Sequence, residues 1–143
     1  MKIKLDEGAI APVRAHETDA GLDLISPVNS FVPAGGSSVI DTGVHVEIPE
    51  GHYGDIKTKS GLNIRHNIMT DGTIDEGYTG SIVVKLYNLG KTDYQVKRGD
   101  KIAQMVVTPV SYVDLEAVEE ITGGSRGDSG FGSTGRSVLK EGE

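Results

Sequence analysis

The sequence predicts an all-β fold, a jelly-roll sandwich or barrel of short strands with at most one short helix and a flexible glycine-rich C-terminal arm. Two observations support this prediction. β-Branched residues gather in short runs, and Gly, Pro, Asn and Asp separate these runs at similar intervals. Many short strands with evenly spaced turns are typical of sandwiches and jelly rolls. The sequence contains no long amphipathic helical pattern.

The clearest expected strands are runs rich in valine and isoleucine, at residues 37–40, 45–48, 81–87 and 101–107. Turn-forming residues between them mark residues 33–36, 49–51, 71–72, 88–90 and 98–100 as turns. A short helix is expected at residues 60–67, because Leu62 and Ile64 follow Ser60. The pattern therefore alternates strands and turns along the chain, with one helical interruption.

Length and composition predict one domain and exclude several classes of function. A chain of 143 residues buries enough surface for a hydrophobic core without a metal or disulfide. We expect a β core at residues 1–121 and an arm at residues 122–143. The absence of cysteine excludes thiol chemistry and zinc–thiolate sites, and the net charge of −7 argues against nucleic acid as a partner. Without a signal-like or membrane-spanning apolar run, a cytoplasmic protein with no membrane partner is expected.

The arm carries side chains that suit a nucleotide. Residues 123–135 include six glycines, which favour mobility until a ligand holds the segment. Arg126 offers a charged fork, Ser133 and Thr134 offer hydroxyls, and Phe131 offers a flat aromatic face. A ligand with phosphates and a ring matches this set. The alternative is a disordered glycine-rich tail, although Phe131 between two glycines has no use in a solvated linker.

Two further places combine charge with a local structural role. Asp23 lies between two leucines in a strand-like segment, so its carboxylate is expected to be paired or to face a cavity. The alternative places it on the solvent face of an edge strand. Lys59, Ser60 and Gly61 precede the expected helix and together make an anion site. The alternative is an ordinary helix N-cap by Ser60.

Carboxylates and an amide mark the last two places. Asp71 and Gly72 form a tight hairpin in this prediction, and Asp75 follows at the end of a strand, where it is positioned as a general base. Tyr78 offers a ring for a sugar. The alternative is a plain strand end closed by a glycine turn. Gln104 interrupts an apolar run, so its buried amide needs a backbone, water or ligand partner.

Taken in order, five segments resemble the five motifs of the trimeric deoxyuridine triphosphatase (dUTPase) family. They are residues 19–24, 59–62, 72–80, 99–104 and 126–135. The resemblance covers nearly the whole chain. Each motif alone is a weak signal, but five motifs in the family's order are a specific one.

The resemblance implies a jelly-roll homotrimer that hydrolyses dUTP to dUMP and pyrophosphate with Mg²⁺, in active sites between subunits. Asp75 matches the carboxylate that activates the attacking water near the α-phosphate and also meets the ribose 3′-OH. Tyr78 matches the ring under the deoxyribose. The backbone of Asp71, Gly72 and Thr73 would read the uracil edge.

Gln104 and Asp23 complete the catalytic set that the resemblance implies, Gln104 at the catalytic water and Asp23 in the network around the metal. No protein side chain is expected to bind the metal directly, because the substrate phosphates hold it, with Asp23 acting through water. The remaining substrate-binding residues, at the phosphates or in the closing arm that stacks Phe131 on uracil, are Lys59, Ser60, Gly61, Arg126, Phe131, Gly132, Ser133 and Thr134.

One departure and two alternatives stay open. Lys59 stands where the family's second motif begins with arginine, so the charge is kept and the bidentate fork is lost. A dCTP deaminase with dUTPase activity would share the fold, but it needs an additional acid/base group for the cytosine amine. A nucleotide-responsive interaction protein, in which ordering of the arm is the signal, is the alternative from another class.

Overall fold

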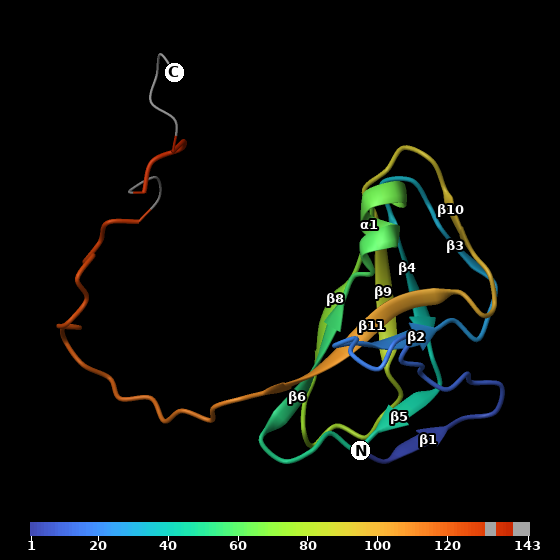
Figure 1. Cartoon of the computed structure of the whole chain (residues 1–143), viewed down its shortest axis with the longest axis horizontal. Helices are drawn as coiled ribbons and strands as arrows, with labels where there is room; N and C mark the ends of the chain where they lie inside the picture. The colour runs from blue at the N-terminus through green and yellow to red at the C-terminus, as the bar shows by residue number, and fades with distance from the viewer. Residues whose placement is uncertain (131–133, 139–143) are drawn as a thin grey trace. The chain divides into compact units, whose positions relative to one another are not determined.

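Eleven strands and one short helix make up the part of the chain that the computed structural model describes, residues 1–130 and 134–138 (Figure 1). The expected predominance of strands, with a single helix, is confirmed. In chain order the elements are β1 (Ile3–Leu5), β2 (Leu22–Ile25), β3 (Ser30–Val32), β4 (Ser37–Asp41), β5 (Val44–Val46), β6 (His52–Lys57), α1 (Ser60–His66), β7 (Ile68–Met69), β8 (Asp71–Ile74), β9 (Val83–Asn88), β10 (Tyr94–Val96) and β11 (Lys101–Pro109).

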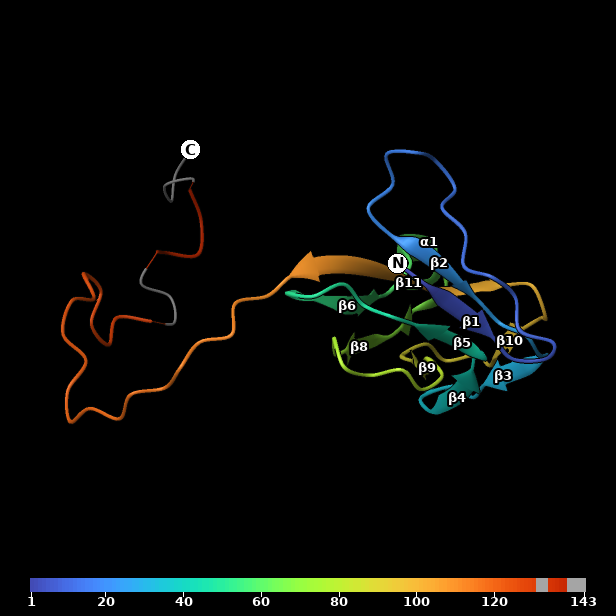
Figure 2. The same cartoon turned by 90° about the horizontal axis from the view of Figure 1, so that it is seen from below.

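The strands pair antiparallel in two larger and two smaller sheets. The larger sheets have the orders β2-β11-β6-β8 and β4-β9-β7, and the smaller ones pair β1 with β5 and β3 with β10. Figure 2 shows β1 beside β5. Strand β11 packs against β9, so the two larger sheets meet around a common interior.

The core lies between these sheets and is aliphatic. Strand β9 shows the required alternation, because Val84 and Leu86 point inward and the residues between them point outward. Leu24 and Met105 come from the other sheet and are completely buried. The remaining buried members of the cluster are Val32, Ile40, Val44, Val46, Ile48, Ile56, Ile68, Ile74, Ile82, Val96, Ile102 and Ala103.

The expected turn at Asp71 and Gly72 is wrong. Both residues belong to β8, where Asp71 pairs with Lys57 and Gly72 with Ile56. The chain changes sheets one residue earlier, at Thr70. The Thr58 hydroxyl donates to the Thr70 carbonyl at 2.7 Å and accepts from the Thr70 N–H at 2.8 Å, so it satisfies the backbone groups at the crossing.

The expected turn at residues 98–100 is present but does not form a hairpin. Gly99 has a φ of +94°, and the Asp100 side chain accepts from the Lys97 N–H at 2.8 Å. The strands on either side lie in different sheets, β10 beside β3 and β11 between β2 and β6. This turn therefore links two sheets.

The chain divides into two compact units, Met1–Tyr112 and Val113–Glu143. All of the strands and the helix described above belong to the first unit. In the second unit the described residues include neither helix nor strand, and near the turn at residues 125–128 the Ser129 N–H donates to the Arg126 carbonyl at 2.9 Å. The expected division at residue 121 stays a prediction. Within the described residues, none of the helical structure has the length and apolar character needed to span a bilayer.

Candidate active site

Four of the residues expected at the phosphates line one pocket of about 390 Å³. Asp23 comes from β2, Lys59 and Ser60 from the start of α1, and Gln104 from β11. The sheet order explains why they meet, because β2 and β11 are neighbours and Asp23 pairs in register with Gln104. Gly61, the next helical residue, is not among the residues that line this pocket.

Asp23 is buried between two lysines. Its side chain accepts from Lys59 Nζ at one carboxylate oxygen and lies 2.7 Å from Lys101 Nζ at the other. Burial acts to raise the pKa of Asp23, but the hydrogen bonds from Lys101 and Lys59 outweigh it and hold the pKa below its ordinary value. Strand β2 is an edge strand, yet the carboxylate is only 6% exposed. The solvent-facing alternative for Asp23 is therefore wrong.

Lys101 also lines this pocket and was not expected there from the sequence. The expected burial of Asp23 could have indicated a nearby lysine, because a carboxylate removed from water needs a compensating charge. Two lysines around one carboxylate leave an excess of one positive charge among these three groups, and the Asp19 carboxylate that also lines the pocket pairs with His16 at 3.2 Å. Such an excess suits an anionic ligand.

Gln104 is half-buried and has a backbone partner. Its side-chain amide donates to the Thr58 carbonyl at 3.3 Å, which confirms the expectation of a backbone partner. The amide oxygen is turned toward Gly21. A Cβ atom at Gly21 would lie 2.4 Å from Oε1 of Gln104, so only glycine allows this approach. The first and fourth motifs of the sequence thus touch each other.

The start of α1 differs from the expected N-cap. Lys59 occupies the N-cap position with extended backbone, Ser60 is the first helical residue, and no side chain caps the helix. The expectation that Ser60 caps the helix is therefore wrong. The Lys59 side chain is instead directed to Asp23, and Ser60 lines the pocket beside it.

Asp75 lies in a second pocket, of about 600 Å³, at the opposite end of β8 from Asp71. The turn that follows β8 is closed by the Tyr78 N–H, which donates to the Asp75 carbonyl at 3.0 Å. Glu76 anchors this turn, because its carboxylate accepts from Tyr112 Oη at 2.6 Å and from the Gly51 N–H at 2.8 Å. These hydrogen bonds, the Tyr112 one foremost, lower the pKa of Glu76.

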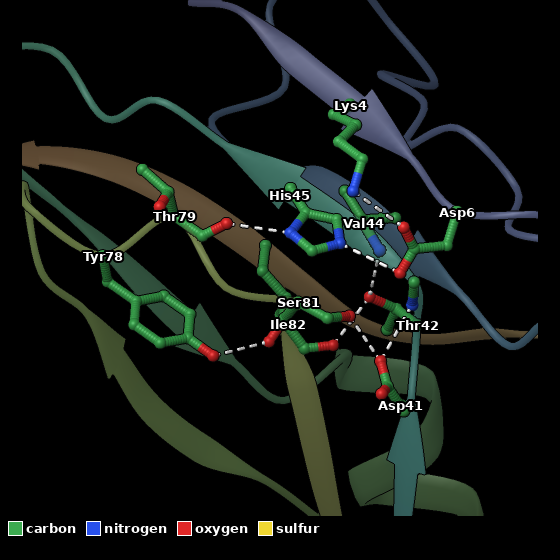
Figure 3. A network of polar contacts seen from close by, with 11 residues as sticks. Lys4, Asp6, Asp41, Thr42, Val44, His45, Tyr78, Thr79, Ser81 and Ile82 are labelled. Atoms are coloured by element: carbon green, nitrogen blue, oxygen red, sulfur yellow. Dashed lines mark hydrogen bonds and ion pairs between the residues drawn. The ribbon is translucent and has the colours of Figure 1, made fainter.

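Tyr78 is held in one orientation. Figure 3 shows its hydroxyl directed to the Ser81 carbonyl, to which it donates at 2.9 Å. The ring lies against Gly80, where an added Cβ atom would be 2.4 Å from the phenolic oxygen. The side chain is about half exposed, at 45%. Tyr78 therefore presents an ordered aromatic surface to solvent.

Asp71, Gly72 and Thr73 lie in a strand at the edge of the four-stranded sheet. In the described residues β8 pairs with β6 on one side and has no strand partner on the other. An edge strand presents backbone N–H and C=O groups in a fixed order. The strand geometry that replaces the expected hairpin can still pair with the edge of a planar base.

The two pockets share no lining residue, and the register keeps Asp75 away from Gln104. Gln104 pairs with Lys57, and Lys57 with Asp71, four residues before Asp75. Crossing from β11 over β6 to β8 takes two strand spacings, and Asp75 lies four residues further along. The Cα atoms of Gln104 and Asp75 are therefore about 16 Å apart. One water molecule therefore does not reach both side chains within one chain.

The expected arm residues are described only in part. Arg126 donates from Nη2 to the Ser129 carbonyl at 3.1 Å, and Thr134 is exposed. Phe131, Gly132 and Ser133 lie outside the described residues. Their expected roles at the base and the γ-phosphate stay predictions.

Comparison with known proteins decides the family. A family model described as dUTPase matches residues 7–135. The chain belongs to the dUTPase family. The deoxyuridine 5′-triphosphate nucleotidohydrolase of Clostridium acetobutylicum is 46% identical over 139 residues, which is 94% of this chain and 96% of that protein. The resemblance inferred from the five motifs is confirmed.

Solved dUTPase structures also match the fold. A mutant dUTPase of Staphylococcus bacteriophage 80alpha with dUpNHpp has a TM-score of 0.84 and 30% identity, covering 94% of this chain and 98% of that one. A mutant dUTPase of phage phi11 of S. aureus, in which coordination of a structural Mg(II) ion is described, has a TM-score of 0.77 and 30% identity, covering 83% and 96%. The structural neighbours are jelly-roll β folds, so the predicted fold class is confirmed.

Proposed function

We propose that this chain hydrolyses dUTP to dUMP and pyrophosphate. Membership of the dUTPase family supports the activity. The observation that carries the proposal is the pocket in which Lys59, Lys101, Ser60 and Gln104 surround a buried carboxylate, because it offers charged and neutral hydrogen-bond donors to phosphate oxygens. Such donors stabilise the charge that develops in phosphoryl transfer.

In the proposed reaction a water molecule attacks the α-phosphorus. Its oxygen forms the new bond to phosphorus as the bond to the bridging oxygen of pyrophosphate breaks, and the Asp75 carboxylate takes the proton. Gln104 orients the same water or a phosphate oxygen beside it. No side-chain nucleophile is needed, because positioning and charge stabilisation supply most of the catalysis.

Mg²⁺ fits this site as an ion that the substrate brings. Among the described residues, no group of three or more His, Asp or Glu side chains is arranged to hold a metal. Asp23 already pairs with two lysines, so its carboxylate would contact a hydrated ion only through water. When bound, the ion neutralises charge on the phosphates. The protein groups hold and orient the triphosphate around it.

Selection of the nucleoside is assigned to β8 and the turn after it. Tyr78, fixed by Gly80 and Ser81, is the ring under the deoxyribose, and it rejects a 2′-hydroxyl by contact. The unpaired edge of β8 at Asp71, Gly72 and Thr73 reads uracil. Cytosine reverses the donor and acceptor pattern on that edge, so it would leave backbone groups unpaired.

The active site is proposed to form between subunits of a homotrimer. The separation of about 16 Å between Asp75 and Gln104 within one chain supports this, because both are assigned to the same catalytic water. A second copy would bring its Asp75 to the lysine pocket of the first. The arm is proposed to close over the bound nucleotide, with Arg126, Ser133 and Thr134 at the γ-phosphate and Phe131 on the base.

The activity is tested by pyrophosphate release from dUTP, UTP, dCTP and dTTP in the presence of Mg²⁺. We expect dUTP to be turned over far faster than the others. Asp75→Asn is the matched inactive variant, since it is isosteric and should keep the fold. Release from all four nucleotides at equal rates would refute the proposed specificity. Formation of a deaminated product from dCTP would support the deaminase relative instead.

A further inference from the structure

His45 contacts the segment that carries Tyr78. It lies on β5, and Figure 3 shows its ring between Thr79 and Asp6. Nδ1 is 2.8 Å from the Thr79 carbonyl oxygen, and Nε2 is 2.9 Å from a carboxylate oxygen of Asp6. Neither oxygen carries a hydrogen, so both ring nitrogens must donate for both bonds to form. The geometry is that of a protonated imidazolium.

The charged groups around His45 favour this protonated form. Asp6 approaches from the residue after β1, and Lys4 of β1 lies 3.1 Å from its other carboxylate oxygen. Asp41 is at the end of β4, beyond the Thr42–Val44 turn (Figure 3). Glu47 and Lys2 line the same groove and pair with each other at 2.9 Å. Lys4 opposes protonation of His45, whereas Asp6 supports it.

The hydrogen bonds define a pH window for the pair. The bond to Asp6 and then that to Thr79 raise the pKa of His45, and bonds from His45 and Lys4 lower the pKa of Asp6. The pair is therefore charged from the lowered pKa of Asp6 up to the raised pKa of His45. Above that value the neutral ring has one N–H, so one of its two donated bonds is lost.

The Tyr78–Ser81 segment is held at few points, and His45 provides one of them. The Ser81 hydroxyl donates to Asp41, whose same oxygen accepts from the Gly43 N–H at 3.0 Å. The Tyr78 ring lies over Gly80 and bonds to the Ser81 carbonyl. Thr79, between these residues, is held through its carbonyl by His45. Among the contacts of this segment within the described residues, only that of His45 contains a group that titrates near neutral pH.

We propose that His45 is a positioning residue for Tyr78, and that its imidazolium holds the Thr79 carbonyl so that the ring rejects substrates with a 2′-hydroxyl. This inference rests on the proposed function and assigns part of its specificity to a residue outside the five sequence motifs. Loss of the proton frees Thr79 or Asp6. The segment then gains freedom, and the ring discriminates less sharply between deoxyribose and ribose.

The test compares kcat/KM for dUTP and for UTP across neutral pH in the wild type, His45→Ala and His66→Ala. His66 is a matched control, because it contacts Tyr94 at 4.9 Å between ring centroids, away from Thr79. In the wild type the dUTP-to-UTP ratio should fall as the pH rises through the His45 pKa. In His45→Ala the dUTP-to-UTP ratio should be about tenfold lower than in the wild type and independent of pH. A tenfold change corresponds to the loss of one charge-assisted hydrogen bond. A general loss of stability would lower both rates together.

A second readout does not depend on activity. The ¹⁵N resonances of the His45 ring should show both nitrogens protonated below its titration midpoint, and that midpoint should lie above the ordinary value for histidine. Asp6→Asn should lower that midpoint, and circular dichroism should confirm that each variant is folded. An unchanged dUTP-to-UTP ratio in folded His45→Ala, or a His45 midpoint that Asp6→Asn does not lower, would overturn the inference. If the wild type fails to hydrolyse dUTP, the proposed function fails while this titration still reports on the contact.

Discussion

Two variants that are each inactive should restore activity together if the active site is shared between subunits. Asp75→Asn removes the proposed base, and Lys59→Met removes a phosphate-binding charge. Lys59→Met leaves Asp23 paired with Lys101 at 2.7 Å, so the buried carboxylate keeps a counter-charge. We expect Asp75→Asn to lower turnover by about 10²–10⁴-fold. For Lys59→Met we expect a loss of about 10²-fold, because one charged donor at the phosphates is missing.

The expected recovery follows from the geometry. Asp75 and the lysine pocket are about 16 Å apart in one chain, so a functional site must combine Asp75 from one subunit with Lys59 from another. When equal amounts of the variants are unfolded and refolded together, each contribution is intact in half of the subunits. About a quarter of the sites then have both residues, and activity should reach about a quarter of the wild-type value.

Pyrophosphate release from dUTP measures the recovery, and native mass spectrometry confirms that mixed trimers have formed. Co-refolding of wild type with the double variant Asp75→Asn/Lys59→Met is the control. A shared site predicts about a quarter of the wild-type activity in this control, whereas a site within one chain predicts about half. Confirmed mixed trimers that stay as inactive as their parents would refute the shared site.

Three other changes test single parts of the molecule. Gly80→Ala places a methyl group where the phenolic oxygen of Tyr78 lies and displaces the ring. The ratio of kcat/KM for dUTP to that for UTP should therefore fall about tenfold, measured by pyrophosphate release. Asp23→Asn leaves two lysines uncompensated and should cost about 3 kcal/mol of unfolding free energy in urea at neutral pH. That difference should shrink as the pH falls through the lowered pKa of Asp23, because the wild-type carboxylate is then protonated; an unchanged difference contradicts the charge argument. Phe131→Trp introduces the only tryptophan of the chain, and its fluorescence should respond to dUpNHpp with Mg²⁺ more than to dUMP.

The strands that sequence predicted best are those with long β-branched runs. Residues 81–87 and 101–107 correspond to β9 and β11. Strand β9 is buried at alternate positions, and β11 is buried or half-buried everywhere except at its two ends. The strands β1, β3 and β10 have three residues each and were not expected. These strands form because they pair with distant segments, as Ile3 does with Val46. A sequence of three residues does not reveal such a pairing.

The site residues were predicted from chemistry, and their arrangement was not. Asp23 and Gln104 were singled out because polar groups in apolar runs need partners, and Asp23 has two lysines while Gln104 has the Thr58 carbonyl. The turn expected at Asp71 failed because Asp-Gly favours a turn locally, whereas pairing of β8 with β6 extends the chain there. His45 gave no signal, because its partners Asp6 and Thr79 come from distant parts of the sequence.

The close approach of Gln104 to Gly21 has a consequence for protein engineering. A side chain at position 21 fits only if the Gln104 side chain moves away or is shortened, and either change takes the amide from its present place in the pocket. Single-site saturation mutagenesis would therefore score Gly21 as essential, although glycine brings no functional group of its own. A library that varies both positions together would separate the two causes: inactive but stable double variants would identify the amide as the requirement and the glycine as the space it needs.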